Sequence, residues 1–197
     1  MCGRYLIDDE AYADIWELLN NPLFSKDFLL QTVAKGEVFP TNLAPVYTKE
    51  GVAAVKWGFP HWQNAGEVII NARSETALDK NMFKRPLRER RCVVPSNGFF
   101  EWHRVAGQKK KDKYLFKHHD DDKLYMAGIF NTFREPSGAE YNAFVILTTD
   151  ASDSVARIHN RMPLILKEDE REYWLNDDIF MELVLRRPGP ELLSEAA

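Results

Sequence analysis

A cysteine directly follows the initiator methionine, in the run Met1-Cys2-Gly3-Arg4. Once Met1 is removed, as is usual before a small second residue, Cys2 carries a free α-amine and a thiol on adjacent carbons. Such a 1,2-aminothiol condenses with an aldehyde through the amine, and the thiol then closes a five-membered thiazolidine ring. The amine titrates at roughly 8 and the thiol at roughly 8.5, so a modest shift makes either group nucleophilic at physiological pH. The alternative is a chemically idle chain end.

An amide and a guanidinium follow the apolar residues 68–70. Asn71 can hold a substrate oxygen or orient an amine, and Arg73 can bind a phosphate through two parallel hydrogen bonds. The alternative is that Asn71 or Ser74 caps a helix.

A carboxylate and an imidazole lie at the edges of two further predicted elements. Glu101 is flanked by the aromatic residues of the run 98–102, and desolvation there would raise its pKa and suit it to proton transfer. His159, in the run 158–163, can act as an acid or a base near neutral pH. The alternatives are a solvent-facing strand position for Glu101 and a half-buried, hydrogen-bonded ring for His159.

Together, the terminal amine and thiol, the amide, the carboxylic acid and the imidazole would suffice for imine chemistry. Arg4, Arg73 and Arg161 offer phosphate contacts. The chain has no glycine-rich phosphate loop, serine elbow or paired-histidine motif. Its two cysteines lack the spacing of a zinc site, so neither a metal nor another cofactor is expected. Cys92 should be a buried small hydrophobe, with a Cys2–Cys92 disulfide as a minor alternative.

Charge is distributed unevenly along the chain. Residues 71–117 hold thirteen basic and five acidic residues, a balance of +8, whereas the net charge of the chain is −4 and the remainder carries −12. Such asymmetry indicates a surface that faces a polyanion; a solvated charged face is the alternative.

The composition is that of a soluble globular protein, with 197 residues, 45% hydrophobic and 28% charged. No apolar run approaches the ~18 residues that span a bilayer, so no membrane association is expected. Acidic residues at positions 8–10 leave no secretory signal, which favours a cytoplasmic protein. A monomer is the default expectation.

The elements that must position these groups are mostly strands. Apolar periodicity predicts helices over 9–19, 75–90 with a break at Pro86, 150–158 and 167–176, and an ordered proline-rich loop over 39–45. Short β-rich runs separated by turn signals predict the remaining elements. We expect one α+β domain over 1–197, with antiparallel strands in a barrel-like core, peripheral helices and a flexible tail over about 188–197. The predicted strands are 52–57, 67–70, 92–94, 99–103, 114–117, 124–130 and 143–149.

The motifs, taken in order, resemble those of the SOS response-associated peptidase (SRAP) family of abasic-site processing proteins. No single motif is decisive, but the ordered set covers most of the chain. The matching segments are 1–4, Pro40 with 42–45, 57–59, 71–76, 91–95, 98–102, 127–129, 146–149 and 158–163.

The resemblance implies a protein that binds single-stranded DNA, including junctions with duplex, and crosslinks to the aldehyde of an abasic site. It implies that Cys2 is the nucleophile, that Asn71 positions the sugar or the amine, that Glu101 transfers protons, and that His159 assists the imine steps and reversal. The activity implied is a lyase-like imine chemistry in the DNA damage (SOS) response, alongside a cysteine-type peptidase activity. The DNA contacts implied are Arg4, Pro40, Asn42, Trp57, Arg73, Arg85, Trp102, Thr149 and Arg161.

Two other functions remain open at this stage. Cys2 with His159 or Glu101 could form a thiol peptidase or a self-processing hydrolase. Alternatively, the basic half could bind single-stranded nucleic acid without catalysis while Cys2 stays idle. Salt-dependent binding is expected both of a crosslinking protein and of a non-catalytic binding module. Only covalent capture of DNA distinguishes these functions.

Overall fold

The structure is a computed structural model that describes residues 2–8, 33–64, 66–105, 107, 109–119 and 123–197. The helix predicted over 9–19 lies outside these residues.

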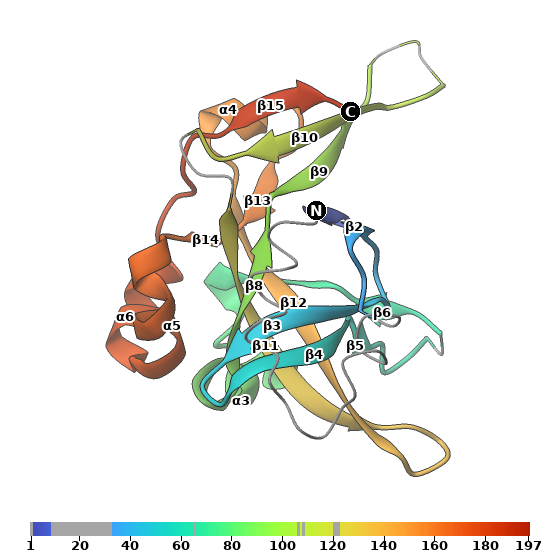
Figure 1. Cartoon of the computed structure of the whole chain (residues 1–197), viewed down its shortest axis with the longest axis vertical. Coiled ribbons are helices and arrows are strands. Elements are labelled where there is room, and N and C mark those ends of the chain that lie inside the picture. The colour runs from blue at the N-terminus through green and yellow to red at the C-terminus, as the bar shows by residue number, and fades with distance from the viewer. Residues whose placement is uncertain (1, 9–32, 65, 106, 108, 120–122) are drawn as a thin grey trace.

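Five strands close into a barrel at the centre of the molecule: β3 (Leu43–Thr48), β4 (Gly51–Trp57), β8 (Arg91–Ser96), β11 (Leu124–Arg134) and β12 (Glu140–Asp150) (Figure 1). The ring runs β12–β4–β3–β8–β11 and closes where β11 pairs with β12. Every pairing in it is antiparallel except the short parallel one between β12 and β4. The predicted α+β fold with a barrel-like core is therefore confirmed. The proline-rich loop is shorter than predicted, because β3 already begins at Leu43.

Short strands extend the barrel at its ends. β7 (Asn71–Arg73) runs parallel to β12, β13 (Arg161–Pro163) pairs with the end of β12, and β14 (Ile165–Leu166) pairs with β11. β5 (Phe59–Pro60) and β6 (Val68–Ile69) form a separate two-stranded ribbon.

A second sheet lies at the upper end of Figure 1, in the order β15 (Leu193–Ala196), β10 (Asp112–Lys117), β9 (Gly98–His103), β1 (Tyr5–Ile7) and β2 (Gly36–Val38). The first and last described strands of the chain thus belong to one sheet. The flexible tail predicted over 188–197 is wrong for residues 193–196, because their backbone pairs with β10.

Strand β8 and the central parts of β11 and β12 are buried on both faces, and their side chains alternate between two cores with the two-residue period of a strand. On β12, Phe144 and Ile146 point into a core shared with the second sheet, where Tyr5 and Phe99 lie. Alternate residues such as Val145 point into a second core beneath the helices. The helical elements are η1 (Ser74–Thr76), α3 (Asn81–Glu89), α4 (Asp153–Ala156), η2 (Glu168–Glu170), α5 (Arg171–Asn176) and α6 (Asp178–Val184).

The helices differ from the prediction in two places. The 75–90 segment divides into η1 and α3, and α3 continues through Pro86 without a break. Pro86 and the adjacent Leu87 are buried, so packing offsets the backbone hydrogen bond that proline cannot donate. Helix α6 was not predicted; the Asp177 side chain caps it by accepting from the amides of Ile179 and Phe180.

Arg91 ties three of these helices to the barrel. Its side chain is only 1% exposed, and its guanidinium donates to the carbonyls of Leu87, Trp174 and Leu175 and to the Asp178 carboxylate. One side chain thereby satisfies the carbonyl ends of α3 and α5 and anchors the start of α6.

Replacing Arg91 by alanine should lower the free energy of unfolding by about 3 kcal/mol, because several buried carbonyls lose their donor. Urea unfolding followed by circular dichroism measures the change. The matched control is Arg88→Ala, since Arg88 is exposed and pairs with Glu182 at 3.5 Å. An equal loss for both variants would contradict a special role for Arg91.

Candidate active site

The carbonyl of Cys2 is held by the side chain of Asn71, whose Nδ2 donates to it over 2.9 Å. Both residues are buried. Asn71 opens β7, and its place is fixed by the parallel pairing with Ile146 of β12. The preceding carbonyl, of Ile70, accepts from the Trp57 indole at 3.1 Å. The barrel therefore brings together Cys2 and Asn71, which are 69 positions apart in the sequence.

Trp57 has a different place from the one predicted for it. It is fully buried and packs edge-on against Tyr5, with ring centroids 5.1 Å apart. The prediction that Trp57 lines a DNA channel is wrong, because no face of its ring is open to a base. Its contribution is to fix the backbone just before Asn71.

The other end of the Asn71 amide is open. Its Oδ1 is buried and has no hydrogen-bond partner within the described part of the chain. A buried amide oxygen without a donor costs about 1–3 kcal/mol, so a ligand hydroxyl or amine that donates to it would be favoured.

Glu101 reaches the same site from β9. Side chains on β9 alternate, so Phe99 and Glu101 face the core whereas Phe100 and Trp102 lie on the opposite face, where Lys113 covers Phe100 and Trp102 is half-buried. Glu101 is only 3% exposed, which rules out the solvent-facing alternative. Its negative charge lies close enough to the Cys2 thiol to perturb it.

The Cys2 thiol is strongly held in its neutral form. Burial raises its pKa far above the ordinary value, and the Glu101 charge raises it further. The thiol donates to the Arg4 carbonyl at 3.5 Å, which also requires the protonated form. Cys92 is also fully buried, and burial raises its pKa as well. Both cysteines are free thiols, so the disulfide alternative is not observed.

Native protein should therefore react slowly with iodoacetamide at both cysteines. For an ordinary thiol the rate rises about tenfold per pH unit up to a pKa near 8.5, because the thiolate is the nucleophile. Here the raised pKa keeps both thiols protonated, and labelling should stay low from pH 7 to 9. Mass spectrometry of digests measures it against guanidinium-unfolded protein. Labelling of Cys2 at the unfolded rate at pH 8 would contradict this description.

His159 lies in the connection between α4 and β13. Its Nδ1 accepts from the backbone amide of Arg161 at 3.0 Å, so in the neutral ring the proton is on Nε2. The neighbouring Ile158 packs against the large hydrophobic core that also contains Cys2. Half-burial and the hydrogen bond fit the structural alternative for His159.

Arg73 is exposed and lies beside a hollow of about 570 Å³ that Asn71 also lines. Trp62, on the same hollow, is 69% exposed and stacks on His61 with ring centroids 4.8 Å apart. An open tryptophan thus stands next to Asn71. The exposed tryptophan near Asn71 is Trp62 rather than the predicted Trp57, and the sequence alone does not show which of the two is exposed.

The turn before β3 holds Pro40 and Asn42, both half-buried. The Asn42 Oδ1 accepts from the Phe39 amide at 2.9 Å, and Thr41 takes a left-handed φ of 72°. This turn presents Phe39 at the surface, over the guanidinium of Arg4. Trp102 lies on the other side of Arg4, with its ring 5.0 Å away.

Of three further predicted DNA contacts, two are buried inside the protein and one is exposed on a helix. Arg161 is buried, and its guanidinium binds Glu75, Asp150 and the carbonyl of Thr148, which holds η1, β12 and β13 together. Thr149 is buried and donates to the Arg187 carbonyl at 3.3 Å. Arg85 is exposed on α3 and pairs with Glu89 at 2.8 Å. Arg161 and Thr149 are buried by partners from other elements, so these two predicted DNA contacts are wrong. Arg85 pairs with a residue one turn along its own helix and stays a predicted contact.

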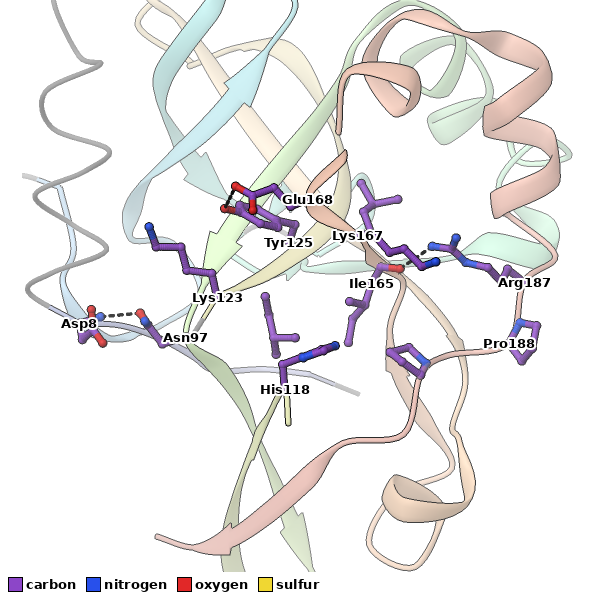
Figure 2. A pocket seen from close by; sticks show the side chains of 13 residues that line it. Asp8, Asn97, His118, Lys123, Tyr125, Ile165, Lys167, Glu168, Arg187 and Pro188 are labelled. Carbon is purple, nitrogen blue, oxygen red and sulfur yellow. Dashed lines mark hydrogen bonds between the residues drawn. The ribbon is translucent and has the colours of Figure 1, made fainter. Parts of the chain in front are cut away.

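A cavity of about 750 Å³ lies at the other end of β1. Figure 2 shows Asp8 and Asn97 on one side of it and Arg187 and Pro188 on the other. Extended chain rises about 3.3 Å per residue, so Asp8 is roughly 20 Å along the strand from Cys2. None of the predicted site residues lines this cavity.

Within the described part of the chain, no group of three or more His, Cys, Asp or Glu side chains is arranged to hold a metal ion. No helix among the same residues has the length and apolar character to cross a membrane.

Residues 1–188 match the family described as SOS response associated peptidase (SRAP). The chain belongs to this family. The SRAP chain is 30% identical over 190 residues to the abasic site processing protein YoqW of Bacillus subtilis, which covers 89% of this chain and 80% of that protein. It is 41% identical over 148 residues to the abasic site processing protein HMCES of Gallus gallus, covering 62% of this chain and 44% of that longer protein.

Solved structures share this fold. A crystal structure of a Bacteroides thetaiotaomicron protein has a TM-score of 0.84 at 25% identity, over 99% of this chain and 91% of that chain. A Bordetella bronchiseptica protein shares the fold, with a TM-score of 0.76 at 19% identity over 100% of this chain and 99% of that chain.

Proposed function

We propose that this protein captures abasic sites in single-stranded DNA, including those at junctions with duplex, by a covalent bond to Cys2. One observation carries the proposal: the Cys2 backbone is held by Asn71, whose open Oδ1 lies in a buried site with the Glu101 carboxylate. Relatives named as abasic site processing proteins support the substrate class.

The reaction begins at the amine, once Met1 has been removed. The lone pair of the Cys2 nitrogen attacks the C1′ aldehyde of the ring-opened deoxyribose. The Glu101 carboxylate relays the two protons of the amine to the carbonyl oxygen, which leaves as one water, and an imine remains. Amine attack comes first because the thiol is neutral, and a neutral thiol is a poor nucleophile.

The second step closes the ring. The Cys2 sulfur adds to the imine carbon, its proton passes through Glu101 to the imine nitrogen, and a thiazolidine results. Asn71 orients the Cys2 backbone through Nδ2 and accepts a substrate hydroxyl or the amine at Oδ1. His159, through Nε2, assists proton transfer as the sugar opens and as the adduct reverses.

DNA binding would combine phosphate contacts with stacking. Arg4 and Arg73 are the cations beside Cys2 and Asn71, and Trp62 and Trp102 are partly or largely exposed rings close to them. Each stacked base contributes roughly 1–3 kcal/mol. An abasic nucleotide has no base to unstack, so it enters a narrow site at low cost.

A thiol peptidase fits this site less well. It would need a thiolate at Cys2, whereas burial and the Glu101 charge both favour the protonated thiol. Imine chemistry instead uses the amine and needs the sulfur only after the substrate is bound.

Protein freed of Met1 should form a heat-stable adduct with an oligonucleotide that contains one abasic site, read on a denaturing gel. Cys2→Ser should give no stable adduct, only an imine that borohydride traps, because a hydroxyl closes the ring poorly. Cys92→Ser is the matched control and should crosslink normally. A stable band that persists in Cys2→Ser, or one formed with undamaged DNA, would contradict the mechanism.

Glu101→Gln should slow crosslinking about 100-fold or more, the usual effect of losing a general acid. Its affinity for undamaged single-stranded DNA should stay within about threefold, because Glu101 faces the core. Arg73→Ala should show the converse, with weaker binding and a salt dependence reduced by about one ion. The proton-transfer role fails if Glu101→Gln lowers affinity and rate in equal proportion.

A further inference from the structure

Arg4, Glu37 and Lys113 form a charge cluster on the second sheet. The Glu37 carboxylate uses one oxygen for each cation: Oε2 lies 3.2 Å from Arg4 Nη1, and Oε1 contacts the Lys113 ammonium. The three residues come from the start of the chain, from β2 and from β10, so long side chains meet across the curled sheet.

Aromatic rings fix both cations from the side. The Arg4 guanidinium lies 4.1 Å from the Phe39 ring and 5.0 Å from that of Trp102, and the Lys113 ammonium lies 4.0 Å from the Phe100 ring. Such contacts hold the cations without neutralising their charge. Arg4 Nε is also buried with no hydrogen-bond partner in the described structure, so this guanidinium keeps a spare donor.

We propose that the Glu37 carboxylate occupies the position of a DNA phosphodiester between Arg4 and Lys113 and competes with it. The inference rests on the proposed function, and it adds Lys113 as a phosphate contact and Glu37 as an internal competitor. A carboxylate and a phosphodiester are both monoanions that present two oxygens to paired donors. A phosphodiester could therefore replace Glu37 with no change in the charge of the cluster.

The location suits this exchange. Arg4 is two residues from Cys2, so their Cα atoms are at most about 7 Å apart, and a phosphate next to the captured sugar falls within reach. The Glu37 side chain is 33% exposed and lies on the edge strand β2, so it can turn into solvent. Hydrogen bonds and charge from Lys113, and then Arg4, lower the pKa of Glu37, which keeps the competitor ionised at neutral pH.

The alternative is that Glu37 only orients Arg4 for binding. The two roles predict opposite signs. Neutralising a competitor strengthens DNA binding, whereas removing an orienting partner weakens it.

Glu37→Gln is the test, with fluorescence anisotropy of undamaged single-stranded DNA at several salt concentrations. We expect the affinity for DNA to rise about threefold to tenfold at low salt, because DNA no longer has to displace two partly exposed ion pairs of Glu37. The dependence of log affinity on log salt concentration should steepen by about one. Glu195→Gln is the matched control, since Glu195 pairs with Lys117 on the same sheet at 3.1 Å. It should leave affinity unchanged.

Lys113→Gln alone should weaken binding, and adding it to Glu37→Gln should remove the gain. Unchanged or weaker binding by Glu37→Gln, or no effect of Lys113→Gln, overturns the inference. Crosslinking of the wild-type protein to abasic DNA is measured in parallel. If the wild type crosslinks but Glu37→Gln binds no better, only this inference fails; if the wild type neither binds nor crosslinks, the proposed function fails.

Discussion

The hydrogen bond from Asn71 to the Cys2 carbonyl is the constraint on which the site depends. A chain end has large conformational freedom, and chemistry at the second residue requires that freedom to be removed. The barrel supplies the anchor: β12 sets the register of β7, and Trp57 holds the carbonyl just before Asn71. Trp57 thereby helps to fix the position of Cys2 through Ile70 and Asn71, although none of the described hydrogen bonds joins Trp57 to Cys2 directly.

Strand β9 shows how one segment serves two chemistries. Its two-residue alternation sends Glu101 into the core beside the Cys2 thiol and Trp102 to the outer face against Arg4. The proposed proton-transfer group is thus desolvated while the proposed phosphate-binding groups stay hydrated. A shift of β9 by one residue against β1 would exchange the two sets, so the pairing of Tyr5 with Phe99 matters for function as well as for stability.

Local patterns predicted much of the fold, and three residues that they singled out, Cys2, Asn71 and Glu101, lie close together. The runs at 92–94, 99–103 and 143–149 are strands because their β-branched and aromatic residues are buried on a pleated surface. What failed depended on remote partners. Trp57 looks like a binding tryptophan until the barrel closes over it, and Arg161 looks like a phosphate ligand until Glu75 and Asp150 approach it. No property of the residue itself signals either outcome.

Pairing of β1 with β9 joins residues more than ninety positions apart, so the N-terminal strand cannot find this neighbour until about half of the chain has been synthesised. Cys2 is enclosed once that docking is complete. If Met1 is excised as proposed, the aminopeptidase meets the most accessible substrate co-translationally, on an extended nascent end, before β9 emerges. Maturation of the nucleophile and closure of its surroundings would then be separated in time by the order of synthesis alone.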